Sequence, residues 1–102
     1  MRDIESMLRN HAAATALRAA GQPIWRHKID LRHVFREERL TFEQRRDAIV
    51  RRLRTSAWAV GNPEVLELAD ELADTADGDQ FDQVWDAVYD QADEDRVWIA
   101  TF

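Results

Sequence analysis

The chain has 102 residues, a length that allows one folded domain with a modest core. Its hydrophobic content of 45% is that of a folded protein, and the absence of cysteine excludes a disulfide framework and thiolate zinc sites. The formal net charge of −6 is unevenly divided, with 13 basic and 7 acidic side chains in residues 1–60, then 13 acidic and 1 basic in residues 61–102. Charge segregated this strongly is typical of an interaction surface, because like charges repel unless an opposite charge meets them.

The N-terminal residues indicate neither export nor membrane insertion. An acidic side chain, Asp3, comes early, and the apolar core of a signal peptide is lacking. Elsewhere, no apolar run approaches the roughly 20 residues needed to span a bilayer. We therefore expect a cytoplasmic protein without membrane contact.

Glycine, proline and capping residues divide the chain into helical segments. Apolar spacing predicts a helix over residues 3–20, whose thin apolar stripe suggests a peripheral position in a single domain spanning residues 1–102. A capping box at Thr41 and Gln44 predicts a second helix over residues 42–58.

Two further helices are expected in the acidic half. Asn62 is predicted to cap a helix that begins at Pro63, since asparagine is a favoured N-cap and proline suits the first turn. Asp79 is predicted to cap the last helix. The side chains expected to face the core are Phe42, Ile49, Leu53 and Ala57 in the second helix, Val65, Leu68, Ala69, Leu72 and Ala76 in the third, and Phe81, Val84, Trp85, Val88, Tyr89 and Ala92 in the last.

Two segments favour extended chain over helix. Residues 24–31 alternate apolar and polar side chains, and residues 97–102 are rich in β-branched and aromatic ones. Because a short strand needs a partner, we expect a two-stranded β-ribbon between them, the alternative being two apolar connectors packed across the helices. The predicted fold class is therefore mainly α, a compact bundle of about four helices with this small ribbon.

Motifs for catalysis or metal binding are weak. His27, Asp30 and His33 are spaced three apart, but without a fourth ligand or a cysteine we expect no metal site. The acidic turn around Gly78 does not fit the calcium-loop pattern, because nonligating residues would occupy the ligand positions. No serine lies in a nucleophile elbow, and no glycine-rich phosphate loop is present. We expect neither catalytic residues nor a cofactor.

Acidic side chains recur at helical spacing near the C-terminus. Spacings of four, four and three residues from Asp82 to Asp93 place them on one face of the last helix, beside the acids of the preceding helix. Such a face could bind a basic protein surface, or could simply be solvated. The residues predicted to bind a protein partner are Glu67, Glu71, Asp74, Asp82, Asp86 and Asp90.

Arginines on the helix predicted over residues 42–58 suggest an alternative. A short helix over residues 31–38, a turn over residues 39–41 and this arginine-rich helix have the outline of a helix-turn-helix DNA reader. The nucleic-acid-binding residues would be Arg45, Arg51, Arg52 and Arg54. The arginines could instead be solvated or pair with the acidic half. A third possibility is a homodimer of structural role, in which basic and acidic halves of two copies meet.

Three stretches of sequence, at residues 24–30, 41–52 and 81–90, resemble small proteins of actinobacterial phages, such as those of mycobacteriophages. The resemblance covers roughly residues 22–102, and the family has no assigned activity. It implies a phage gene product that acts in the cytoplasm of a bacterial host. The leading hypothesis is a non-catalytic protein–protein interaction module, a phage accessory factor that binds a host protein through its acidic helix face.

Overall fold

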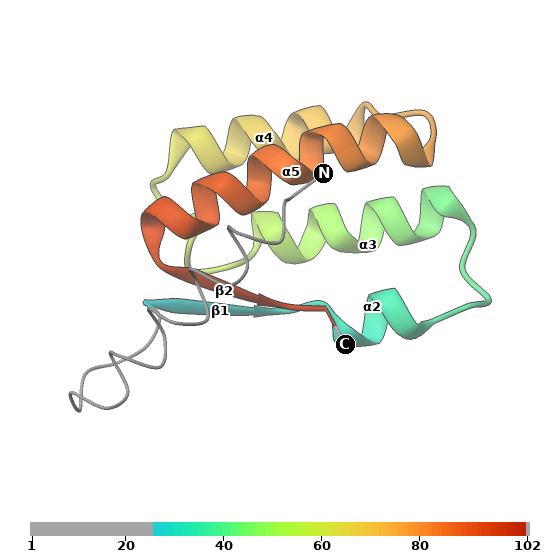
Figure 1. The fold of residues 1–102 in the computed structure, drawn as a ribbon, viewed down its shortest axis with the longest axis horizontal. Helices are drawn as coiled ribbons and strands as arrows, with labels where there is room; N and C mark the ends of the chain where they lie inside the picture. Colours follow the sequence, from blue (N-terminus) through green and yellow to red (C-terminus); the bar gives the residue numbers. More distant parts are fainter. Residues whose placement is uncertain (1–25, 102) are drawn as a thin grey trace.

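The computed structural model describes residues 26–101. In chain order these residues form β1 (His27–Asp30), α2 (Arg32–Arg36), α3 (Phe42–Arg54), α4 (Pro63–Ala73), α5 (Gly78–Asp95) and β2 (Val97–Ala100) (Figure 1). The predicted class, mainly α with a small two-stranded ribbon, is confirmed for this part of the chain. The helix predicted over residues 3–20 lies outside the described residues.

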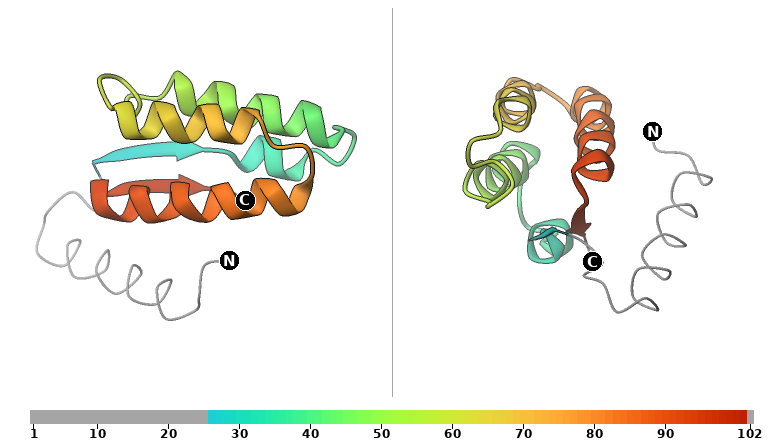
Figure 2. Two further views of the ribbon diagram at one scale, coloured as in Figure 1. Left: turned by 90° about the horizontal axis from the view of Figure 1, so that it is seen from above. Right: turned by 90° about the vertical axis from the view of Figure 1, so that its left-hand side faces the viewer.

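The two strands are parallel, with His27 opposite Val97 and Asp30 opposite Ala100. Parallel neighbours cannot be joined by a tight turn and need a long crossover. Here the connection between the strands contains all four described helices. In the right-hand view of Figure 2, α4 and α5 lie side by side at the upper edge of the molecule, and the strand pair lies at the lower edge.

The core lies between α3, α4, α5 and the inner face of the strand pair. Its largest fully buried side chains are Leu31, Val34, Ile49, Leu53, Val65, Leu72 and Val88. Each contributes about 1.5–3 kcal/mol through removal of apolar surface from water. The apolar stripe predicted for α5 is confirmed, since all six side chains are buried or packed against the core.

Aromatic rings contact one another where α2, α3 and α5 meet. The ring centroid of Trp85 on α5 lies 6.1 Å from that of Phe35 on α2, 5.7 Å from Phe81 and 5.4 Å from Tyr89. Phe42 at the start of α3 meets Phe81 edge to face, with centroids 6.2 Å apart. A five-residue helix has little stability alone. The contact of Phe35 with Trp85 therefore helps to hold α2 in place.

The predicted capping box at the start of α3 is confirmed. Thr41 Oγ1 accepts a hydrogen bond from the Gln44 amide at 3.1 Å, and Gln44 Oε1 accepts one from the Thr41 amide at 3.0 Å. We expect Thr41→Ala to lower the free energy of unfolding by about 1 kcal/mol, because the first turn loses a partner for its amide. Urea unfolding would measure this loss, and Thr41→Ser should retain most of the stability. Equal stability of Thr41→Ala and the wild type would contradict the cap.

The end of α3 differs from the prediction, because the helix stops at Arg54 and not at Trp58. Thr55 Oγ1 and Ser56 Oγ donate to carbonyls of the last helical turn, at 2.9 Å and 2.6 Å. Such bonds compete with continuation of a helix. The following turn directs Trp58 into the core and leaves Ala57 exposed, so the predicted burial of Ala57 is wrong.

The caps of α4 and α5 also differ from the prediction. Asn62 occupies the N-cap position of α4, but its side chain makes no capping bond. The last helix begins at Gly78, two residues earlier than expected, because Asp77 and not Asp79 caps it: Asp77 Oδ1 accepts from the Gln80 amide at 2.9 Å. Since α4 ends at Ala73, Ala76 lies beyond the helix and is exposed, contrary to its predicted burial.

The chain turns from α5 into β2 through Arg96, which has a left-handed backbone conformation with φ 58°. A side chain is disfavoured there, whereas glycine adopts this conformation freely. We expect Arg96→Gly to raise the free energy of unfolding by about 1 kcal/mol. Thermal and urea unfolding would measure the gain, and Arg96→Ala would separate backbone strain from loss of charge. A gain in Arg96→Ala as large as that in Arg96→Gly would contradict this explanation.

Candidate protein-binding surface

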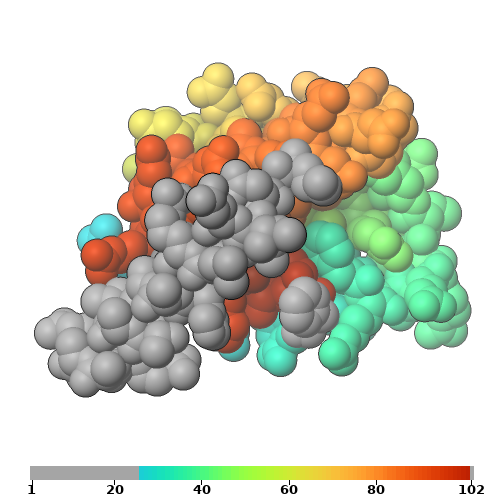
Figure 3. All heavy atoms as spheres, viewed as in Figure 1, coloured from blue at the N-terminus to red at the C-terminus, as the bar shows by residue number. Residues whose placement is uncertain are grey.

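The hairpin of α4 and α5 carries almost all of the acidic half. Residues 61–95 contain 13 acidic side chains and no lysine or arginine. The two helices pack side by side at the upper edge of the molecule in Figure 1, and their atoms form the upper rim of the space-filling view in Figure 3. Their apolar residues, among them Val65, Ala69 and Val88, face the core. The acids are therefore left on the outside of the hairpin.

Eight of the acidic side chains are exposed and have no hydrogen bond or ion pair from their carboxylates to another described residue. We call them the hairpin acidic surface: Glu64, Glu67, Glu71, Asp74, Asp79, Asp82, Asp90 and Glu94. Five of the six residues predicted to bind a partner are included. The additional three, Glu64, Asp79 and Glu94, could have been found in the sequence from the charge of the whole hairpin.

Asp86, the sixth predicted residue, is half-buried and already has an interaction partner in the protein. Asp86 and Asp95 are about two and a half turns of α5 apart, so they lie on opposite sides of the helix. Asp95 contacts Asn62 at the start of α4. Asp86 therefore lies on the flank of α5 that faces away from α4. Asp82 lies on that same flank, one turn earlier, whereas Asp90 lies further outward.

One ion pair links the two charge halves within the described residues. Arg54 at the end of α3 donates to Asp70 of α4 at 2.7 Å. Both side chains are well exposed, so the pair adds little stability, on the order of 0–1 kcal/mol. A second arginine, Arg46, donates to the carbonyl of Thr75 after α4 at 2.7 Å. Neither arginine contacts a carboxylate of the hairpin acidic surface, which therefore has no cation partner from residues 26–60.

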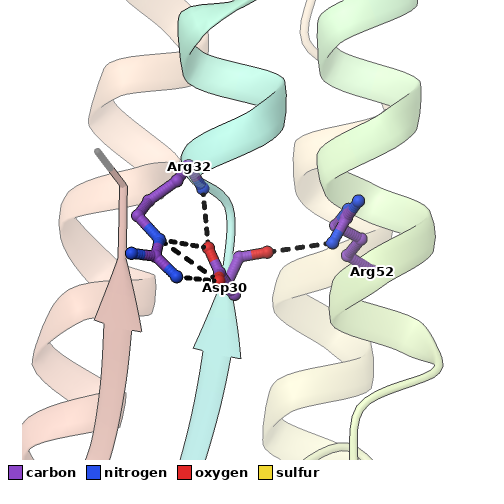
Figure 4. Close-up of polar contacts among 3 residues, drawn as sticks. All are labelled: Asp30, Arg32 and Arg52. Carbon is purple, nitrogen blue, oxygen red and sulfur yellow. Dashed lines mark hydrogen bonds and ion pairs between the residues drawn. The ribbon is translucent and has the colours of Figure 1, made fainter.

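Three of the four arginines of the DNA-binding alternative donate to other residues of the described part. Arg45 is half-buried and donates to the carbonyl of Glu37 at 2.9 Å, and its Nε is buried without a hydrogen-bond partner in the described residues. Arg52 donates to the carbonyl of Asp30 at 3.0 Å (Figure 4), and Arg54 pairs with Asp70. Only Arg51 lacks a side-chain hydrogen bond or ion pair to another residue of the described part.

A carboxylate at the base of the hairpin has a structural role. Asp95 Oδ2 accepts hydrogen bonds from Trp58 Nε1 at 2.8 Å, Gln91 Nε2 at 3.1 Å and Asn62 Nδ2 at 3.2 Å. Partial burial acts to raise the pKa of Asp95, but the bonds from Trp58, Gln91 and Asn62 together outweigh it and hold the pKa below its usual value. Sequence reasoning missed this cluster, because Trp58 and Asn62 are far from Asp95 in the chain.

The end of β1 is fixed by a second polar contact. The side chain of Arg32 donates to both carboxylate oxygens of Asp30, with its Nη2 2.7 Å from Oδ2, and the Arg32 amide donates to Oδ1 at 3.0 Å (Figure 4). Hydrogen bonds from the side chain and amide of Arg32 hold the pKa of Asp30 well below its usual range. The Asp30 side chain thus stabilises the turn between β1 and α2.

The described residues contain no group of three or more histidine, aspartate or glutamate side chains placed to hold a metal ion. His27 is half-buried in β1 and His33 is exposed on α2. His11 lies outside the described part of the chain. None of the helices within residues 26–101 is long and apolar enough to cross a membrane.

Comparisons with models of protein families, with curated proteins and with solved structures found no match for this chain.

Proposed function

We propose that this protein is a non-catalytic protein–protein interaction module that binds a basic protein surface through the hairpin acidic surface. The observation that carries the proposal is the set of eight exposed carboxylates on the hairpin of α4 and α5 that no described cation neutralises. Crowded like charges repel one another, and a basic partner would relieve that repulsion on binding.

A protein partner is favoured over nucleic acid by the arrangement of the arginines. Phosphate binding requires cations that are free to meet the backbone of DNA. Arg45, Arg52 and Arg54 instead donate to groups within the fold. The acidic hairpin would in addition repel phosphates from the side of the molecule that it covers. DNA binding through α3 is therefore the alternative outcome of the test.

We further propose an origin and a place of action for this protein. The resemblance to small actinobacterial phage proteins supports a phage accessory factor, and its partner would then be a basic protein of the bacterial host. Such a factor would act in the host cytoplasm. A second copy of this chain is a further possible partner, in a homodimer where the hairpin acidic surface meets the arginines of α3.

Charge reversal on the hairpin tests the proposal. We expect the wild type to bind a fluorescein-labelled peptide rich in lysine and arginine, with an affinity that falls as salt rises because salt screens exposed charges. Asp82→Lys combined with Asp90→Lys should weaken binding about tenfold or more, because both side chains are exposed and would now repel the probe. Fluorescence anisotropy would measure the affinity.

The matched control changes the net charge equally but away from the hairpin. Glu38→Lys combined with Glu43→Lys alters two exposed acids around the start of α3. We expect this variant to retain most of the affinity for the basic peptide. Equal loss in both variants would show that net charge alone drives binding, and would contradict a defined surface. Circular dichroism and sedimentation would show whether both variants stay folded and whether the wild type self-associates.

A further inference from the structure

The outer edge of β1 is unpaired within the described residues, because the sheet has two strands only. In a parallel pair, alternate residues direct their amide and carbonyl groups toward the partner strand. The Leu31 amide donates to the carbonyl of Ala100 at 2.6 Å. The backbone amide and carbonyl groups of residues 29 and 31 therefore point toward β2. Lys28 and Asp30 therefore direct their backbone groups away from β2.

The contact of Arg52 agrees with this alternation. Its Nη1 donates to the carbonyl of Asp30 at 3.0 Å, from α3 on the side of β1 away from β2 (Figure 4). The groups left on this edge are the amide and carbonyl of Lys28 and the amide of Asp30. A regular strand edge of this kind pairs readily with an added extended chain.

A groove runs along the same edge. One cavity of about 270 Å³ lies between β1 and the end of α3, lined among others by Lys28, Arg52 and Ser56. A second cavity of about 510 Å³ shares His27 and Ala57 with the first and continues toward the start of α4. Together they leave room for an extended chain beside β1, with the turn after α3 as a wall.

Side chains on the two faces of β1 define what such a chain would carry. On the outer face, Lys28 Nζ lies 4.9 Å from the ring centroid of Trp98, which is 49% exposed. An acidic side chain opposite Lys28 on a neighbouring strand would meet a cation there. On the inner face, Ile29 is buried and Ala57 lines the groove, so an apolar side chain fits.

We propose that the β1 edge binds an extended peptide segment of a partner protein, in which acidic and apolar side chains alternate, as a third strand. The segment would bond the free backbone groups of Lys28 and Asp30. Its acids would lie beside Lys28 and its apolar residues would fill the groove below. This surface meets the hairpin acidic surface only at Glu64, which lines the second cavity, and it takes a ligand of opposite charge beside Lys28.

The probe for this surface is a short fluorescein-labelled peptide in which glutamate and valine alternate. We expect saturable binding by fluorescence anisotropy, with amide shifts of Lys28 and Asp30 in two-dimensional NMR spectra. A peptide of alternating lysine and valine should not bind at this edge. Absence of saturable binding of the glutamate peptide, or shifts confined to other residues, would overturn the proposal.

Two substitutions at Lys28 separate backbone pairing from charge. Lys28→Pro removes an amide that points away from β2, a position that an edge strand tolerates. We expect it to weaken binding of the peptide about tenfold, whereas Lys28→Ala should weaken it only a few-fold, since the backbone donor remains. Equal affinity of Lys28→Pro and the wild type would contradict strand addition.

Controls distinguish this proposal from the other binding modes of the molecule. Asp82→Lys combined with Asp90→Lys should bind the glutamate peptide as well as the wild type does, because neither residue lines the groove. Peptide binding lost in that variant would place the site on the hairpin and overturn the inference. Self-association that the peptide does not displace would show that a second copy occupies the edge, which would also overturn it.

Discussion

Replacement of Trp85 by alanine is expected to lower the free energy of unfolding by about 3–5 kcal/mol. The Trp85 side chain is 7% exposed, and its ring contacts the rings of Phe35, Phe81 and Tyr89. Alanine would leave a cavity among these rings and loosen the attachment of α2 to α5. A domain of this size has a total stability of about 5–15 kcal/mol, so the variant should be close to unfolding.

Urea unfolding followed by circular dichroism would measure this loss. Trp98→Ala serves as the matched control, since Trp98 is a half-exposed tryptophan on the outer face of β2. We expect its cost to be much smaller than that of Trp85→Ala. Costs of similar size for the two variants would contradict the position of Trp85 in the core.

Asp95→Ala has the second largest expected effect, a loss of about 2–3 kcal/mol. The carboxylate accepts bonds from Trp58, Gln91 and Asn62, and alanine would leave these donors without their partner. Asp95→Asn, which keeps the shape and one acceptor oxygen, should lose less. Urea unfolding at neutral pH would rank the three proteins. Identical stability of Asp95→Ala and the wild type would show that the cluster contributes nothing.

The same carboxylate predicts a dependence of stability on pH. Because the folded pKa of Asp95 lies below its usual value, ionised Asp95 stabilises the fold above the unfolded pKa of about 3.9. This contribution is lost as the pH falls through the folded pKa. The stability advantage of the wild type over Asp95→Asn should therefore shrink as the solution is acidified below about pH 4. An advantage that is unchanged at low pH would contradict the lowered pKa.

Helices with a clear apolar stripe were predictable from the sequence. The stripe from Phe81 to Ala92 and the capping box at Thr41 both have a local cause, so the residues alone reveal them. The end of α3 was not predictable in the same way, because Thr55 and Ser56 bond back to the last turn while Trp58 enters the core. The cap at Asp77 was missed because Asp79, two residues later, is an equally suitable residue type.

Charge on the hairpin was also predictable, since an amphipathic helix without basic residues must expose its acids. Which cations meet that charge could not be predicted from the sequence. Whether Arg45, Arg52 and Arg54 meet carboxylates, carbonyls or solvent depends on how α3 packs against β1 and α4. The parallel direction of the strands likewise follows from the path of the whole crossover. Long-range contacts of this kind leave no local pattern in the sequence.

A side-by-side titration would test the central claim most directly. The wild type would be titrated into a labelled mixed-sequence DNA duplex and into the labelled basic peptide, each at about 50 mM and about 200 mM salt. Binding through the hairpin acidic surface predicts that the peptide binds and weakens at the higher salt, and that the duplex binds at neither. Tight duplex binding that collapses at the higher salt, without peptide binding, would contradict the account and make α3 the binding element.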